Sequence, residues 1–176
     1  TSLRVSRVTA SAMTPEASTN FPSGRMVGLE ATVRGAVVID DSVLRTPGGA
    51  QRAVALELAS VVGTTAPAVT IAHVTASVGA DWDMSGSFLA GLPRAALKLE
   101  GGFGQFLLVN SILSYAGGAV DTMGTVWAAL DLSGVSAPFD LVVARGNVYS
   151  VPILDGGLPA FGSASDALIF CADNEF

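Results

Sequence analysis

Charge is scarce in this sequence. Asp, Glu, Lys and Arg together make up 14% of the 176 residues, whereas an ordinary soluble domain carries about 25%. Lys98 is the only lysine, the arginines are scattered, and the net charge is −6. Because binding to phosphates needs clustered Lys and Arg, we expect no nucleic-acid partner. We also expect much of the surface to be neutral or covered by another subunit.

Other residues that carry chemistry are equally few. Cys171 is the only cysteine and His73 the only histidine, so the chain can form neither an intrachain disulfide nor a zinc site. The glycines of residues 101–104 are not followed by the Lys-Ser/Thr pair of a phosphate-binding loop. We therefore expect no metal and no cofactor. No apolar run reaches the length of about 18 residues that a membrane helix needs, so we expect no membrane partner.

What the sequence does contain is alternation of polar and apolar residues with period two, which is typical of half-buried strands. Gly, Pro, Asn and Asp punctuate the runs, as in short turns. No internal repeat is evident. This pattern predicts an all-β fold in a single domain over residues 1–176, specifically an antiparallel β-sandwich, with a jelly roll as one candidate topology. The expected strands are Leu3–Ala10, Leu29–Ile39, Val69–Val78, Ala95–Glu100, Phe106–Tyr115, Thr125–Leu132, Leu141–Arg145, Val148–Leu154 and Ala167–Cys171.

Two segments allow more than one interpretation. Residues Ala50–Val62 have apolar spacings that fit a helix as well as a strand, and their Ala and Leu content favours a helix. We favour a strand because the surrounding segments are all β. The first 23 residues combine the strand Leu3–Ala10 with a stretch rich in Ser, Thr and Pro. This segment is either a surface loop or an N-terminal arm that reaches a neighbouring subunit.

Few residues suggest catalysis. His73 lies within a predicted strand, and a hydrolase would have to use it as the base beside a nucleophile. The sequence has no nucleophile elbow, so a structural or surface histidine is the favoured interpretation. Asp81 and Asp83 could serve a calcium site or a glycosidase, but their glycine-rich surroundings favour a solvated turn. We expect that the protein is not an enzyme.

Aromatic residues suggest one alternative function. Trp82 or Trp127, with Tyr115 and Tyr149, could form a stacking platform for a sugar in a carbohydrate- or receptor-binding module. Core packing accounts for most aromatic residues, however, and this chain has few of them.

In overall composition the chain resembles the decoration, or cement, proteins of tailed-phage capsids. That resemblance implies a structural virion protein on the outer capsid surface, commonly a homotrimer, with the major capsid protein as its partner. Contacts between subunits would also account for the scarcity of charge. We expect the chain ends to make those contacts, through a set of apolar residues: Leu3, Val5, Phe21, Phe170 and Phe176.

Overall fold

The computed structural model describes the chain as a stack of five coils, each made of three short strands. The described residues are 2–11, 25–46, 52–61, 66–79, 94–115, 127–149 and 153–154. The strands are β1 (Leu3–Ser6), β2 (Thr9–Ser11), β3 (Arg25–Val33), β4 (Val37–Asp40), β5 (Val43–Thr46), β6 (Arg52–Ser60), β7 (Ala68–Ala72), β8 (Thr75–Val78), β9 (Arg94–Gly101), β10 (Gln105–Val109), β11 (Ile112–Tyr115), β12 (Trp127–Val135), β13 (Leu141–Arg145), β14 (Val148–Tyr149) and β15 (Ile153–Leu154).

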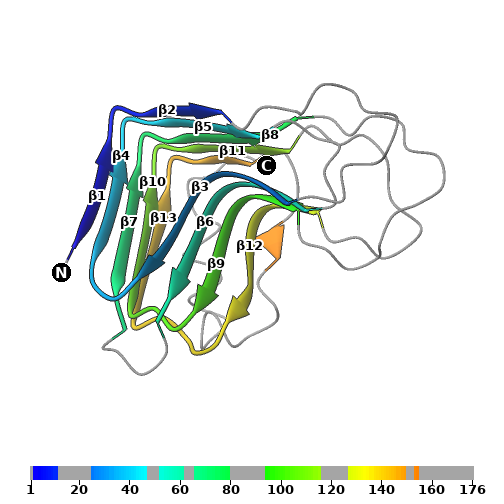
Figure 1. Cartoon of the computed structure of the whole chain (residues 1–176). Coiled ribbons are helices and arrows are strands. Elements are labelled where there is room, and N and C mark those ends of the chain that lie inside the picture. The colour runs from blue at the N-terminus through cyan, green and yellow to red at the C-terminus, as the bar shows by residue number, and fades with distance from the viewer. Residues whose placement is uncertain are drawn as a thin grey trace.

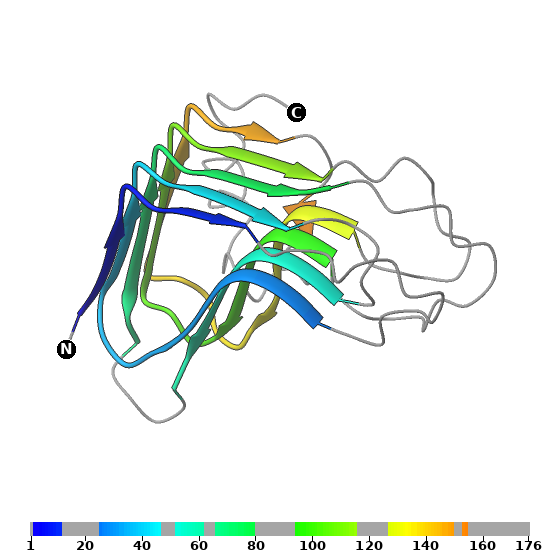
Figure 2. The same ribbon diagram turned by 45° about the horizontal axis from the view of Figure 1, so that its top comes forward.

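Every third strand belongs to the same sheet. Sheet A has the order β1-β4-β7-β10-β13, sheet B the order β14-β11-β8-β5-β2, and sheet C the order β15-β12-β9-β6-β3. All the pairs of strands are parallel. Figures 1 and 2 show the three sheets wrapped around a common interior. The architecture is a parallel β-helix with three faces.

The prediction of an antiparallel sandwich is therefore wrong, although the all-β class is right. Alternation with period two reports that one face of a strand is buried, but it does not report the direction of the neighbouring strand. Within the described residues, the turn at Gly146 joins β13 of sheet A to β14 of sheet B, so it connects two different sheets. The expected strand Leu29–Ile39 is divided in this way, because β3 ends at Val33 and β4 begins at Val37. The ambiguous segment contains strand β6, as favoured.

A repeat that was not recognised in the sequence underlies the stack. Equivalent positions of sheet A lie 34, 32, 37 and 36 residues apart along the chain. Those positions are Leu3, Val37, Val69, Phe106 and Val142. The prediction that the chain has no internal repeat is thus wrong, because each coil is one repeat.

The interior is lined by columns of apolar side chains. Sheet A contributes Ile39 and Ile71, which are fully buried, and sheet B contributes Leu44. Sheet C approaches sheet B closely: the Thr46 hydroxyl donates to the Val54 carbonyl at 3.0 Å. Small residues accordingly occupy the facing positions of sheet C.

The strands of sheet C share a bend. In β3, β6, β9 and β12, the pairing between neighbouring strands is interrupted at one equivalent position. Gly28, Ala55, Ala96 and Ala129 occupy this position. Ala55 and the next residue, Leu56, both belong to the hydrophobic core. The bend therefore changes which side chains face inward, and the strands curve from sheet B towards sheet A (Figure 2).

This fold needs few charged residues on its strands. Strands of parallel sheets commonly have both faces covered, and they then read as apolar runs. In sheet C, residues on both faces of β6 are buried, including Val54 and Leu56. The β-helix thus explains part of the charge deficit without a second subunit.

Candidate functional site

A row of residues with positive φ forms the corner between sheets A and B. Each coil places one such residue there: Arg7 (φ 56°), Asp41 (45°), His73 (55°), Asn110 (48°) and Gly146 (63°). Only glycine adopts this conformation without steric cost, although Asn, Asp and His tolerate it better than most residues. The sharp turn lets a strand of sheet A leave directly into a strand of sheet B.

In three of the five coils, the side chain of the residue that follows the turn links adjacent coils. The Ser42 hydroxyl accepts from the Val8 amide at 3.2 Å, and the Ser111 hydroxyl accepts from the Val74 amide at the same distance. In the last coil, Asn147 accepts from the Ser111 amide at 2.9 Å. Side chains of one coil therefore satisfy backbone donors of the preceding coil, as buried amides require.

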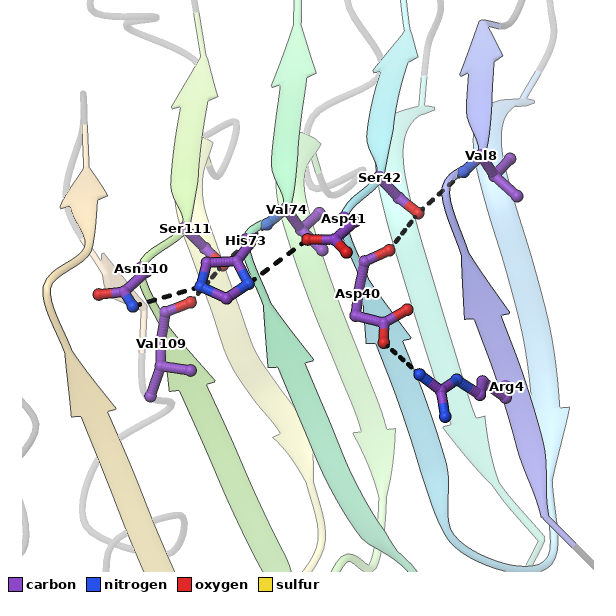
Figure 3. A network of polar contacts seen from close by, with 10 residues as sticks. All are labelled: Arg4, Val8, Asp40, Asp41, Ser42, His73, Val74, Val109, Asn110 and Ser111. Carbon is purple, nitrogen blue, oxygen red and sulfur yellow. Dashed lines mark hydrogen bonds and ion pairs between the residues drawn. The ribbon is translucent and has the colours of Figure 1, made fainter.

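His73 lies on the outside of this corner, not within a strand as predicted (Figure 3). Its Nδ1 is 3.5 Å from Asp41 Oδ1, and its Nε2 is 3.4 Å from the Asn110 side-chain nitrogen. More than half of the surface of both the His73 and Asp41 side chains is exposed. The contacts are compatible with an imidazole that donates from Nδ1 and accepts at Nε2. Asn110 thus lies beside His73 Nε2, where a hydrolase would place its nucleophile.

A second polar contact lies at the N-terminal end of sheet A. The Arg4 guanidinium donates to Asp40 Oδ2 at 2.7 Å, and these residues lie on adjacent strands. A hydrogen bond from the Ser6 hydroxyl and the charge of Arg4 lower the pKa of the Asp40 carboxyl below its ordinary value, against the opposing effect of desolvation. The Arg4 side chain is 70% exposed, so it still offers donors to solvent or to a partner.

The N-terminal coil presents the most incomplete part of the core. Leu3 and Val5 pack against the core but are only partly buried, whereas their counterparts in the next coil, Val37 and Ile39, are 1% and 0% exposed. At the opposite end, Ala144 is fully buried. The exposed apolar interior is thus confined, among the described coils, to the end formed by β1, β2 and β3.

Two of the five predicted interface residues lie at this end. Leu3 and Val5 belong to β1, which pairs with β4. Phe21, Phe170 and Phe176 fall outside the described residues. Sequence reasoning identified Leu3 and Val5 as apolar but missed that β1 is an edge strand.

A row of ionisable residues crosses sheet C at one register position. Glu57, Lys98 and Asp131 are paired across adjacent strands and are 3%, 9% and 1% exposed. Lys98 Nζ lies 3.1 Å from Glu100 Oε2. Asp131 accepts hydrogen bonds from the Ser133 amide and hydroxyl. These contacts give Lys98 and Asp131 the partners that buried charges need.

Those of the other predicted positions that the structure describes form no second site. Tyr149 is buried, and Phe106 stacks on Phe139 with ring centroids 5.5 Å apart in the core. Trp82, Asp81, Asp83 and Cys171 lie outside the described residues, as do the side chains of Trp127 and Tyr115. Within the described ranges, no group of three or more His, Cys, Asp or Glu side chains is arranged to hold a metal ion. Nor does that part of the chain contain a helix long and apolar enough to cross a membrane.

Comparison with known proteins leaves the geometry as the guide to function. No family model, no curated protein and no solved structure matches this chain.

Proposed function

We propose that this protein is a structural attachment module that binds an extended segment of another protein along strand β1. The observation that carries the proposal is the open N-terminal end, where the inward-facing Leu3 and Val5 remain partly exposed. An added strand would cover both side chains and would continue sheet A by one strand. Attachment to a capsid remains a prediction from composition, and so do the virion location and the homotrimer.

The backbone of β1 supports this proposal. The Leu3 amide donates to the Ala36 carbonyl at 2.9 Å, and the Arg7 amide donates to the Asp40 carbonyl at 3.3 Å. Successive residues of a strand direct their N–H and C=O groups to opposite sides. The backbone groups of Arg4 and Ser6 therefore point away from β4, towards the open side. An edge that no other described strand covers is a template for strand addition.

The same geometry provides a selective test. In Arg4→Pro, the strand loses one outward N–H but keeps the hydrogen bonds of Leu3 and Val5 to β4, because the Arg4 amide does not face β4. Arg4→Ala is the matched control, since it removes the same side chain and the same ion pair but retains the N–H. Circular dichroism and thermal unfolding would establish that both variants remain folded.

The probe is the neutral capped peptide Val-Thr-Val-Thr-Val, titrated into the isotopically labelled full chain and followed by amide chemical shifts. We expect shifts confined to β1 and β2, with affinity lowered at least 5-fold in Arg4→Pro relative to Arg4→Ala. Binding that is equal in the two variants, or the absence of shifts at β1, would refute the proposal. Shifts of the free protein that change with its own concentration would instead show that a second copy occupies the edge.

A further inference from the structure

The charges around β1 indicate what kind of strand it accepts. We infer, on the basis of the proposed function, that the partner segment carries carboxylates three residues apart, beside Arg4 and Arg7. Between and before them it carries apolar residues that cover Leu3 and Val5. The recognised sequence is thus apolar–acidic–apolar–any–acidic, and the partner is an acidic, extended stretch of protein.

Arg4 has capacity for a second carboxylate. Its guanidinium carries five N–H donors in a planar fork, and Asp40 Oδ2 accepts from Nη2. The contact with Asp40 holds the guanidinium over sheet A (Figure 3). A carboxylate on a strand added to the opposite side of β1 would approach the remaining exposed donors.

Arg7 supplies the second positive charge. It follows Ser6 directly and occupies the corner, with an exposed side chain and φ of 56°. In the next coil the equivalent corner residue is Asp41. A parallel strand added before β1 would place its own corner residue beside Arg7 on the side opposite Asp41. An acidic residue at that position would give Arg7 a carboxylate on the side opposite Asp41.

A second copy of this chain does not complement these charges. If β13 of one molecule paired in parallel with β1 of another, Arg145 would lie beside Ser6, between Arg4 and Arg7. If two β1 strands paired antiparallel about a two-fold axis, their Arg4 side chains would approach each other. Like charges on directly neighbouring strands are destabilising. A different protein segment with carboxylates is therefore the better occupant.

The parallel direction follows from the rest of the molecule. Each described strand pair is parallel, and each strand of sheet A is followed by the same corner into sheet B. Val37 and Leu3 lie in one apolar column, and Ile39 and Val5 in another. A strand added in parallel would place its two apolar residues beside Leu3 and Val5 and would so extend both columns.

Three capped peptides test the inference: Val-Glu-Val-Thr-Glu, its Gln analogue Val-Gln-Val-Thr-Gln, and Val-Lys-Val-Thr-Lys. Each is titrated into the labelled full chain at low and at about 300 mM salt. We expect the Glu peptide to bind about 3- to 10-fold more tightly than the Gln peptide, since two exposed ion pairs contribute modestly. The Lys peptide should bind most weakly. The advantage of the Glu peptide should shrink at high salt, because exposed pairs are screened.

Variants then locate the effect. The double variant Arg4→Gln, Arg7→Asn should bind the Glu and Gln peptides equally, and asparagine suits the positive φ at position 7. Arg145→Ala, at the opposite edge of sheet A, is the matched control and should retain the preference. Equal binding of the Glu and Gln peptides to the unmodified protein would overturn the inference but leave strand addition intact. Failure of all three peptides to shift β1 would overturn both, and a preference that persists in the double variant would place acidic recognition elsewhere.

Discussion

Asn147 should be among the most important polar residues for stability, and its neighbour in the stack provides a sharp comparison. It is 0% exposed, accepts from the Ser111 amide at 2.9 Å and donates to the Leu108 carbonyl at 2.8 Å. Asn147→Ala removes both hydrogen bonds and leaves a buried amide without this acceptor. Leaving a buried polar group unsatisfied costs about 1–3 kcal/mol. Two such groups give an expected loss of about 2–5 kcal/mol in the free energy of unfolding.

Asn110 is the matched control. It lies at the same corner one coil earlier, but its side chain is exposed and its φ of 48° suits glycine. Asn110→Gly should change the free energy of unfolding by about 0.5 kcal/mol or less, as is usual for exposed positions. Urea unfolding followed by circular dichroism measures both variants, provided that their m-values agree with the unmodified protein. A loss below about 1 kcal/mol for Asn147→Ala would show that water replaces the hydrogen bonds of Asn147 to the Ser111 amide and the Leu108 carbonyl, contrary to this reasoning.

Three further predictions concern positions with defined geometry. Gly28→Ala would place a Cβ 2.6 Å from the Ala55 carbonyl oxygen, so we expect the free energy of unfolding, measured with urea, to fall by about 1–3 kcal/mol. In Gly102→Ala the nearest atom to the new Cβ is 3.5 Å away, so this variant should be neutral. The folded-state pKa of Asp40 is lowered. The ionised carboxylate therefore stabilises the folded protein above the unfolded pKa of about 3.9, and this stabilisation is lost as the pH falls through the folded pKa. Melting temperatures between pH 2.5 and 6 should vary less in Asp40→Asn than in the unmodified protein, and an unchanged profile would contradict this. His73→Gly should alter the free energy of unfolding by less than about 1 kcal/mol, because its φ of 55° favours glycine and the lost contacts are exposed. A larger loss in urea unfolding would show that the contacts of His73 with Asp41 and Asn110 stabilise the corner.

Sequence patterns located most of the described strands but not their connections. The predicted strands Val69–Val78 and Phe106–Tyr115 each contain two strands, because a single residue with positive φ turns the chain between two sheets. His73 and Asn110 occupy those turns, and neither is a glycine. The alternation shifts by one residue at each turn: Val69 and Ile71 are buried before His73, and Val74 and Ala76 after it. Each predicted strand runs through this shift, which was not recognised as a corner.

The repeat was nevertheless visible in one set of segments. Strands β3, β6 and β9 begin Arg-Met-Val-Gly-Leu-Glu, Arg-Ala-Val-Ala-Leu-Glu and Arg-Ala-Ala-Leu-Lys-Leu. The first two are identical at four of these six positions, and the register aligns Leu29, Leu56 and Leu97. Self-similarity at a spacing of 20–50 residues is typical of stacked repeats. Testing for it first would have favoured a parallel β-helix over a sandwich.

The candidate site depends on information that composition cannot supply. Leu3 and Val5 look like any two apolar residues of an alternating strand, and only their place in the first coil leaves them partly exposed. Likewise, Arg4 and Arg7 are two of several scattered arginines until the fold places them along an unpaired edge. Asp40 accepts from one nitrogen of Arg4, so the remaining exposed donors of these two guanidinium groups are what the edge offers to an added strand.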